Sequence, residues 1–407
     1  MGNERNCRSC GEGALIPVLS LGQSPIANAF LREEDLNEEE YFFPLELGFC
    51  ERCYMAQLLH TVDPPKLFHD KYAYYSSTSR TMQAHFKRFA YEITQNFVTK
   101  EHNLVVELGS NDGIMLEAFD ARRVRALGIE PSANVAEAAL RKGLETMVEF
   151  FNEDVARRIV EKHGKAIALA GANVICHIPD MNALLRAADI LLADDGVFVF
   201  EDPSLAQIIE KTAYDQIYDE HVYYFSITSI EELARRHGFR VFHVAPQPTH
   251  GGSNRIYLSK QASTRTVIDS VQKILHAEAD LGLRSVATFE TFARRVEQSR
   301  NDLRGLLQGL KSEGKKLAGY AASSKGNVVL NYCQIGPDTL DFIPHRPSKA
   351  CTRRACIFPS SLLSTLKRTG RITHCCFHGT TPTKSGCMKR LFAKTAANSL
   401  RTCQTYT

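Results

Sequence analysis

The sequence has no run of eighteen or more consecutive apolar residues, about the length that a transmembrane helix needs. Its first residues, MGNERNC, lack the apolar core of a secretory signal peptide. No internal repeat or low-complexity segment stands out. We therefore expect a cytoplasmic protein without a membrane partner. The length of 407 residues, with 44% hydrophobic and 23% charged residues, is typical of a globular protein of two or three domains.

Acidic residues are missing from the end of the chain. The last one is Asp341, and the 66 residues after it carry 12 Lys and Arg and six of the 12 cysteines. The overall charge of +3 is therefore the sum of a body of net charge −9 and a basic tail. An acidic body argues against nucleic acid as the main partner. The abrupt change indicates that residues 344–407 are an aberrant basic tail, produced either by a reading-frame shift in the gene or by lineage-specific extension.

Strands and helices alternate in the middle of the chain. We expect strands at 104–107, 125–130, 167–175, 196–201, 240–244 and 254–259, and helices at 115–119, 133–142, 181–193 and 230–237. Such alternation predicts an α/β protein with a doubly wound, mostly parallel sheet, a Rossmann-like fold. A charged helical stretch at 264–312 follows, and a second α/β unit begins at 316 with a strand, a loop, a helix and a strand at 340–343.

Two CxxC pairs lie in the Cys-, Pro- and Gly-rich region at the N-terminus. The pairs are separated by 39 residues and consist of Cys7, Cys10, Cys50 and Cys53. Four thiolates in two such pairs can close a tetrahedral Zn²⁺ site, which has no open position and is therefore structural. The alternative is free or disulfide-paired thiols, which the absence of a secretion signal disfavours.

The segment VELGSNDG (106–113) follows the first strand of the alternating region. Its two glycines let the backbone approach a ligand, but they do not spell the G-x-G-x-x-G of a dinucleotide site. Acidic side chains in it suit the sulfonium and amino groups of S-adenosylmethionine and would repel a pyrophosphate. An acid after the second strand can accept both ribose hydroxyls of an adenosine, although alone it fits a solvated carboxylate equally well. The predicted cofactor-binding residues are Glu107, Gly109, Asn111, Asp112, Gly113 and Glu130.

The segment YDQIYDEHVYYFS (214–226) gathers acids, tyrosines and one histidine after the fourth strand. A histidine beside a carboxylate can titrate near neutral pH, where a general base works best. His221 is therefore a candidate base, and a structural histidine is the alternative. His177, after the third strand, is a second candidate with the same alternative. The turn HGGSNR (250–255) and Lys325 are weaker phosphate-binding candidates, and the turn fits a plain strand connection equally well.

These motifs together resemble the nucleotide-sugar C-methyltransferases, which make branched deoxysugars for antibiotics. The match runs in order over roughly residues 5–343, and its block YDEHVYY (218–224) is the most specific part. The other motifs are the CxxC pairs, VELGSNDG (106–113), IEPS (129–132), HIPD (177–180), THGGS (249–253) and GYAASSKGN (319–327).

The resemblance implies a zinc-binding module at residues 1–70, a Rossmann-like class I methyltransferase domain at 71–262 and the start of a C-terminal α/β domain at 263–343. It implies S-adenosylmethionine and structural Zn²⁺ as cofactors. The substrate would be a dTDP-linked 4-ketohexose methylated at C3, bound by a monomer.

The resemblance also implies roles for single residues. His221 would remove the C3 proton, and Glu220 and Tyr218 would orient it or hold the sugar. His177 and Tyr72 would line the sugar pocket. The phosphate-binding candidates named above, His250, Arg255 and Lys325, complete the predicted substrate-binding residues. An O- or N-methyltransferase acting on another small metabolite, or a zinc-containing scaffold that binds a nucleotide, are the alternatives.

Overall fold

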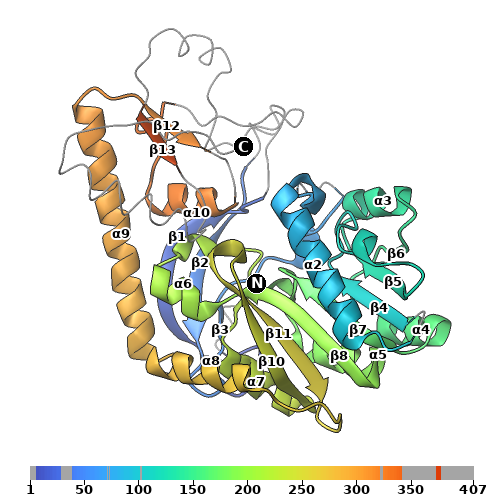
Figure 1. Ribbon diagram of the computed structural model, residues 1–407. Helices are drawn as coiled ribbons and strands as arrows, with labels where there is room; N and C mark the ends of the chain where they lie inside the picture. The colour runs from blue at the N-terminus through green and yellow to red at the C-terminus, as the bar shows by residue number, and fades with distance from the viewer. Residues whose placement is uncertain are drawn as a thin grey trace.

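The computed structural model describes residues 6–28, 39–70, 72, 74–100, 103–320, 324–341 and 373–376. A seven-stranded sheet of order β10-β11-β8-β7-β4-β5-β6 forms the centre of the molecule (Figure 1). Neighbouring strands are parallel except that β11 runs antiparallel to both β8 and β10. This arrangement confirms the expected doubly wound, Rossmann-like sheet.

The strands of the central sheet follow one another through most of residues 103–260. They are β4 (Asn103–Leu108), β5 (Val124–Ile129), β6 (Thr146–Met147), β7 (Ala166–Ala172), β8 (Leu192–Pro203), β10 (Phe239–Gln247) and β11 (Ser253–Lys260). The α-helices around them are α2 (Arg80–Phe97), α3 (Ala133–Arg141), α4 (Glu153–His163), α5 (Met181–Leu191), α6 (Leu205–Lys211), α7 (Ile227–Arg236) and α8 (Asp269–Asp280).

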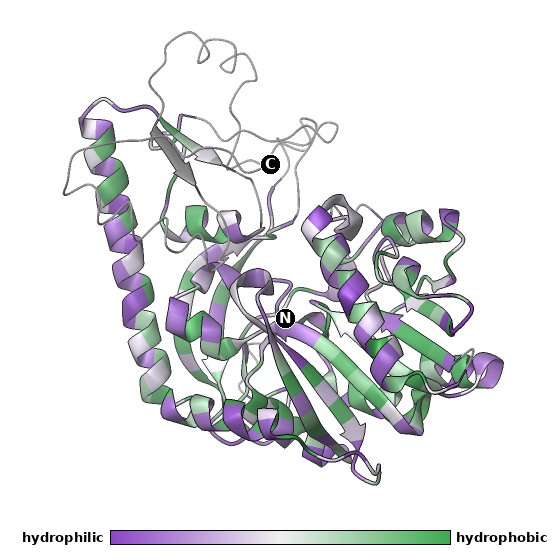
Figure 2. Cartoon of the chain, in the orientation of Figure 1, coloured by the Kyte–Doolittle hydropathy of each residue, from purple (hydrophilic) through white to green (hydrophobic). Residues whose placement is uncertain are grey.

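The helices cover both faces of this sheet because successive strand residues point to opposite sides. Val105 packs with Phe89 and Ile93 of α2 on one face. Val106, the next residue, packs on the other face with α4, α5 and α7, through residues such as Ile159 and Leu184. The strands are accordingly rich in hydrophobic residues (Figure 2), as expected for strands buried on both faces.

A second sheet of order β1-β2-β3-β9 belongs mainly to the N-terminal module. Its strands are β1 (Ile16–Pro25), β2 (Phe42–Phe49), β3 (Ala56–Leu58) and β9 (Tyr223–Tyr224), and the short helix α1 (Pro64–Leu67) follows β3. The last strand comes from the middle of the chain: Ala56 pairs with Tyr224 and Gln57 with Tyr223. The direction of the main chain at β9 is thus set by its pairing with the N-terminal module.

The C-terminal part begins with the long helix α9 (Val286–Ser312), which runs along one side of the molecule (Figure 1). Phe289 of α9 packs on Phe49 of β2, with 4.3 Å between ring centroids. Beyond α9 lie β12 (Leu317–Tyr320), α10 (Ser324–Tyr332) and β13 (Thr373–Cys376), which pairs in parallel with β12. The rest of the expected basic tail, 344–407, lies outside the described residues.

Three element predictions were wrong. The helix expected at 115–119 is a single 3₁₀ turn at Leu116–Ala118. The stretch 264–312 is two helices, because Gly282, with φ of +75°, ends α8 in a left-handed turn. Leu340 and Asp341 of the strand expected at 340–343 are not in a strand, although Asp341 donates its N–H to the carbonyl of Leu317.

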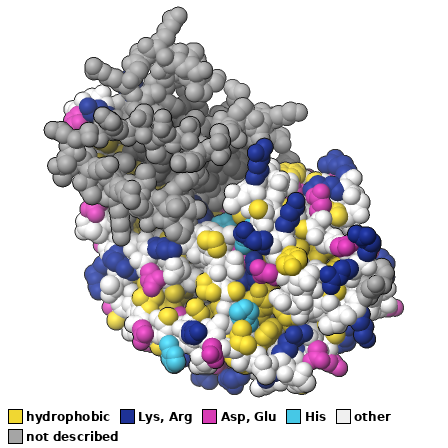
Figure 3. Space-filling view, viewed as in Figure 1, with side chains coloured by type: hydrophobic (Ala, Val, Ile, Leu, Met, Phe, Trp, Pro, Cys, Tyr) yellow, Lys and Arg dark blue, Asp and Glu magenta, His cyan; other side chains and the backbone are white. Residues whose placement is uncertain are grey.

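The surface is mixed in character. The face in Figure 3 shows hydrophobic side chains interspersed with positive and negative ones. Among the described residues, no helix is both long and apolar enough to cross a membrane.

Candidate active site and zinc site

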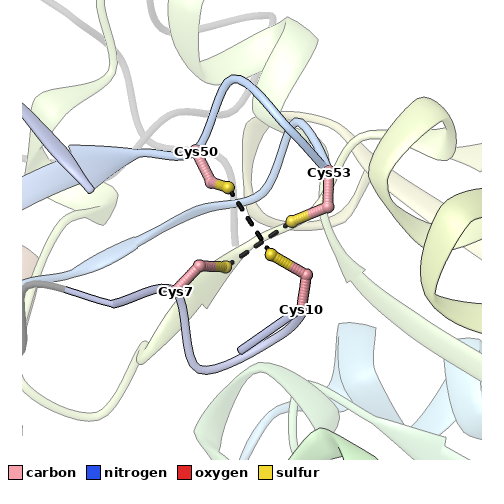
Figure 4. Close-up of side chains that lie close together, drawn as sticks. All are labelled: Cys7, Cys10, Cys50 and Cys53. Atoms are coloured by element: carbon pink, nitrogen blue, oxygen red, sulfur yellow. Dashed lines mark hydrogen bonds between the residues drawn. The ribbon is translucent and has the colours of Figure 1, made fainter. Parts of the chain in front are cut away.

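The four predicted zinc ligands lie together at one end of the N-terminal module (Figure 4). The sulfur atoms of Cys7 and Cys53 are 3.5 Å apart, and those of Cys10 and Cys50 are 3.8 Å apart. A tetrahedral site with Zn–S bonds of about 2.3 Å has sulfur–sulfur edges of about 3.8 Å. The side-chain amide of Gln57 also donates to the Cys7 sulfur at 3.0 Å, as outer groups of zinc sites do. The residues present therefore fit a closed, structural Zn²⁺ site.

The zinc module is bonded directly to the segment that carries the predicted base. Besides the β3–β9 pairing, Leu58 donates its N–H to the carbonyl of Val222 at 2.9 Å. Ala27, after β1, donates its N–H to the carboxylate of Asp219 at 2.9 Å. Residues on both sides of His221 are thus hydrogen-bonded to the N-terminal module.

The predicted cofactor loop lies at the carboxyl end of β4. Gly109 has φ of +61°, and a Cβ there would come within 2.6 Å of Val174. Only glycine fits this turn without displacing its neighbour. The turn brings the backbone of Gly109 and Asn111 to the edge of a cavity at the point where open α/β sheets bind ligands.

Glu130 and Asn111 are held in place by main-chain contacts. The Glu130 carboxylate accepts the N–H groups of Asn111 at 3.0 Å and Ser132 at 2.8 Å. The side-chain oxygen of Asn111 accepts the N–H of Ser76 at 3.0 Å. Burial raises the pKa of Glu130. Glu130 also lines the cavity.

The other acidic residues of the loop lie behind it. One oxygen of Glu107 is buried and has no hydrogen-bond partner among the described residues. Burial, followed by the charges of Glu130 and Asp112, raises its pKa. Asp112 accepts the N–H of Ser77 at 3.3 Å, which fastens the preceding segment over the loop. Glu107, Asp112 and Gly113 shape the turn without lining the cavity.

A single cavity of about 830 Å³ joins the cofactor loop to the predicted substrate residues. This volume lies in the usual range for sites that bind small molecules. The predicted residues that line it are Gly109, Asn111, Glu130, Tyr72, His177, Tyr218, Glu220, His221, His250 and Lys325. The fold therefore brings most of the predicted cofactor- and substrate-site residues to one cavity.

The two candidate histidines are stacked within this cavity. The rings of His177 and His221 lie 5.2 Å apart, and Tyr218 lies 4.1 Å from His221. Burial lowers the pKa of His177 to about 3. Burial, and then the charges that His177, Lys325 and His250 carry when protonated, lower the pKa of His221 well below its usual value. Both imidazoles are therefore neutral near pH 7.

Glu220 is the carboxyl group nearest to the base in sequence. It accepts hydrogen bonds from the Asn28 amide and, at 3.3 Å, from the Tyr72 hydroxyl. Burial, followed by the charge of Asp219, raises the pKa of Glu220 to about 8. The two hydrogen bonds fix the position of the Glu220 carboxyl group. Its pKa of about 8 means that the group changes protonation slightly above neutral pH.

Lys325 extends from the start of α10 into the same cavity. Burial lowers its pKa to about 8, and the charge of Asp215 acts in the opposite direction. His250, also lining the cavity, has a pKa lowered to about 3 by burial. Lys325 is thus the cation of this wall below about pH 8, and it can attract an anion.

Arg255 is the one predicted substrate residue that does not line the cavity. It lies in β11, is 1% exposed, and its guanidinium donates to the Glu201 carboxylate at 2.8 and 3.1 Å. It also pairs with Glu92 and lies 3.8 Å from the ring centroid of Phe89. Through these contacts, the buried Arg255 links the central sheet to α2.

Several residues that line the cavity were not found from the sequence, and three of them contact predicted site residues or each other. Asn28 and Ser324 are joined by a hydrogen bond of 2.6 Å from the serine hydroxyl, and both line the cavity. Phe68 stacks on His177 with 5.5 Å between centroids. No local signal in the sequence marks Asn28 or Phe68. Ser324 lies next to Lys325, and the motif there indicated only the lysine as a ligand.

Family models match the chain in three consecutive parts. Residues 7–68 match a model described as zinc binding, 79–244 a methyltransferase domain, and 248–362 a C-methyltransferase C-terminal domain. The curated C-methyltransferase NovU of Streptomyces niveus is 34% identical over 336 residues, which cover 83% of this chain and 80% of that protein.

Solved structures of methyltransferases are similar over less than half of the chain. Magnesium protoporphyrin IX methyltransferase from Synechocystis covers 44% of this chain and 83% of its own, at 13% identity and a TM-score of 0.35. A SAM-dependent methyltransferase from Anabaena variabilis covers 43% and 84%, at 14% identity and a TM-score of 0.34. The family assignment rests on the family models and on NovU. The chain belongs to the S-adenosylmethionine-dependent C-methyltransferases that carry an N-terminal zinc-binding domain.

Proposed function

We propose that this enzyme methylates C3 of a dTDP-linked 4-keto-deoxysugar and that His221 is the base that removes the C3 proton. The observation that carries the proposal is the shared cavity, which joins the cofactor loop at Gly109 and Glu130 to the stacked His177 and His221. A carbon acid, a base and a methyl donor can meet only where such residues share one space.

The lowered pKa of His221 keeps its imidazole neutral at pH 7, so its lone pair is free to accept a proton, but the same shift makes it a weaker base until a negative charge stands beside it. A positioned base contributes a factor of about 10²–10⁴ to the rate. The Glu220 carboxylate, when ionised, stabilises the imidazolium that forms. Bound S-adenosylmethionine supplies the electrophilic methyl group.

Removal of the C3 proton leaves negative charge on the C4 oxygen, which needs hydrogen-bond donors. Burial keeps the phenols of Tyr218 and Tyr72 protonated, so Tyr218 can donate to this oxygen, whereas Tyr72 donates its proton to Glu220 and can turn it to the sugar only by releasing that bond. The Nε2 atom of His177 is buried and has no hydrogen-bond partner among the described residues. We assign these three groups to the sugar, and Lys325 with His250 to the diphosphate.

The proposed domains are residues 1–70, 71–262 and 263–343, with a basic tail at 344–407. The match to the C-terminal family model ends inside that tail, at residue 362. Retranslation of the gene near codon 343 in the other two frames tests the origin of the tail. An acidic, periodic α/β sequence in either frame would support a frame shift.

Deuterium exchange at C3 tests the proposed chemistry. A panel of dTDP-4-keto sugars is incubated with the enzyme in heavy water, and exchange is followed by NMR. We expect exchange with the wild type and none with His221→Asn, which should still bind S-adenosylmethionine by calorimetry. His276→Asn, at an exposed position of α8, is the matched control. Methylation at oxygen or nitrogen without carbon exchange would contradict the proposal.

A further inference from the structure

Cys176 lies beside the two stacked histidines but has no place in the mechanism above. Its sulfur and one imidazole nitrogen each of His177 and His221 all lie within 4.8 Å of one another. The thiol is free, and it lies in the 3₁₀ turn Ile175–His177 that follows β7. Two further observations point to a ligand: the Nε2 atom of His177 is buried without a partner among the described residues, and the cavity reaches both rings.

We propose that Cys176, His177 and His221 form a second metal site, which binds a borderline divalent transition ion such as Zn²⁺ and thereby inhibits the enzyme. One thiolate and two imidazoles are a donor set that such ions prefer, whereas Mg²⁺ and Ca²⁺ prefer oxygen. Three protein ligands leave a fourth position for water from the cavity.

The spacing is close to what an ion requires. Zn–N bonds of about 2.0 Å and a Zn–S bond of about 2.3 Å place neighbouring donors of a tetrahedron roughly 3.3–3.6 Å apart. Donors within 4.8 Å therefore need to close by about 1 Å or slightly more. Rotation of the two imidazole rings can supply such a movement, because both rings border open space in the cavity.

The charges around the cluster act in both directions. Burial, and then the buried carboxyl groups of Asp202 and Glu220, raise the pKa of the Cys176 thiol. The negative charge of these two carboxyl groups, when ionised, favours a cation. Lys325 disfavours one while it is protonated. The two carboxyl groups oppose ionisation of the thiol as long as no cation is bound. A bound metal ion offsets their charge and deprotonates the thiol, which then serves as a negatively charged ligand.

Inhibition is expected because one of the three metal ligands, His221, is also the proposed base. An ion bound to His221 occupies the lone pair that would accept the C3 proton. The inhibitory consequence rests on the proposed function of His221, whereas the binding of the ion does not. The two can therefore be tested separately.

Cobalt binding tests the site itself. The full-length enzyme, with its Cys₄ site loaded with Zn²⁺, is titrated with Co²⁺ and the thiolate-to-cobalt absorption is recorded. We expect the wild type and Cys333→Ala to show a band that Cys176→Ala and Cys176→Ser lack. Cys333 is the matched control because it is also a buried, free thiol. Subtraction of the variant spectra removes any band from other cysteines. An equal band in the folded Cys176 variants, or none in the wild type, would overturn the proposal.

Inhibition tests the consequence. Methyl transfer is measured over a range of free Zn²⁺, with each protein normalised to its own rate in chelator. We expect the half-inhibitory concentration to rise at least about tenfold in Cys176→Ala, since even outer groups of metal sites contribute 10- to 100-fold to affinity. Equal inhibition of both proteins, or activation by Zn²⁺, would contradict inhibition through this site. If the enzyme transfers no methyl group to any sugar tested, the cobalt band still decides whether the site exists.

Discussion

Asn28, in the N-terminal module, donates a hydrogen bond to the carboxyl group of Glu220, the residue before the proposed base. Its own side-chain oxygen accepts the hydroxyl of Ser324 at 2.6 Å. Parts of the chain that are 296 residues apart in sequence thus meet at Asn28, which in turn binds Glu220. The position of Glu220 therefore depends on the N-terminal module and the C-terminal part together.

Replacing Asn28 by Ala should lower kcat/KM by roughly tenfold or more, since a hydrogen bond to a charged group contributes about 1.5–3 kcal/mol. The Asn28 hydrogen bond lowers the pKa of Glu220, so its loss should also move the Glu220-dependent step of the pH profile upward. Methyl-transfer rates between pH 6 and 9 measure both effects. Asn301→Ala, at an exposed position of α9, is the control. A rate loss without a shifted profile would reduce Asn28 to a structural role.

Lys325 should make substrate binding weaker at high pH. Burial lowers its pKa to about 8, so the cation that attracts the diphosphate is present below that pH and is lost above it. Binding of dTDP, measured by calorimetry, should weaken as pH rises through about 8. Lys325→Ala should bind about 10- to 100-fold more weakly at pH 7 and lose this dependence. Lys315→Ala, half-exposed just after α9, should bind as the wild type does. Identical profiles for all three proteins would argue against a role for Lys325 in anion binding.

Loss of the structural zinc should impair both stability and catalysis. Cys50→Ser removes one ligand of the Cys₄ cluster, and the module then no longer fixes β9 beside His221. We expect the variant to lose its zinc, and Tm to fall by at least about 5 °C, since a loss of about 2 kcal/mol has this effect in a domain of 150–250 residues. Atomic emission, thermal unfolding and methyl transfer measure these changes. Cys333→Ser, which lies away from the cluster, is the control and should keep its zinc. If Cys50→Ser loses its zinc but keeps full activity, the N-terminal module does not act on the active site.

Two glycine substitutions should have opposite effects. Gly109→Ala places a Cβ 2.6 Å from Val174 at a positive φ, so it should lower stability and weaken binding of S-adenosylmethionine. Gly305 lies within α9, where a Cβ meets no atom within 4 Å, so Gly305→Ala should stabilise the protein by about 0.5–1 kcal/mol. Denaturant unfolding and calorimetry with S-adenosylmethionine compare the two variants. Normal cofactor affinity in Gly109→Ala would mean that the turn tolerates the displaced Val174.

The sequence by itself determined the sheet, the zinc ligands and most of the cofactor loop. Each of these has a local cause: buried strands are apolar runs, a zinc knuckle needs two thiols three positions apart, and the turn after β4 needs Gly109. Even the candidate base could be named, because His221 lies in a dense run of acids and tyrosines. Local patterns failed where a helix was judged by apolar content alone, as at 115–119.

Only the tertiary structure decided which side chains share the cavity. Arg255 looked like a phosphate ligand in its turn, but the neighbouring strand and α2 supply Glu201 and Glu92, which bury and neutralise it. Asn28 carries no local signal, and it reaches Glu220 because β1, β2 and β3 end in pairing with β9. Burial then set the pKa of Glu220 near 8 and kept His177 neutral, and burial is a property of the packed chain and not of any segment.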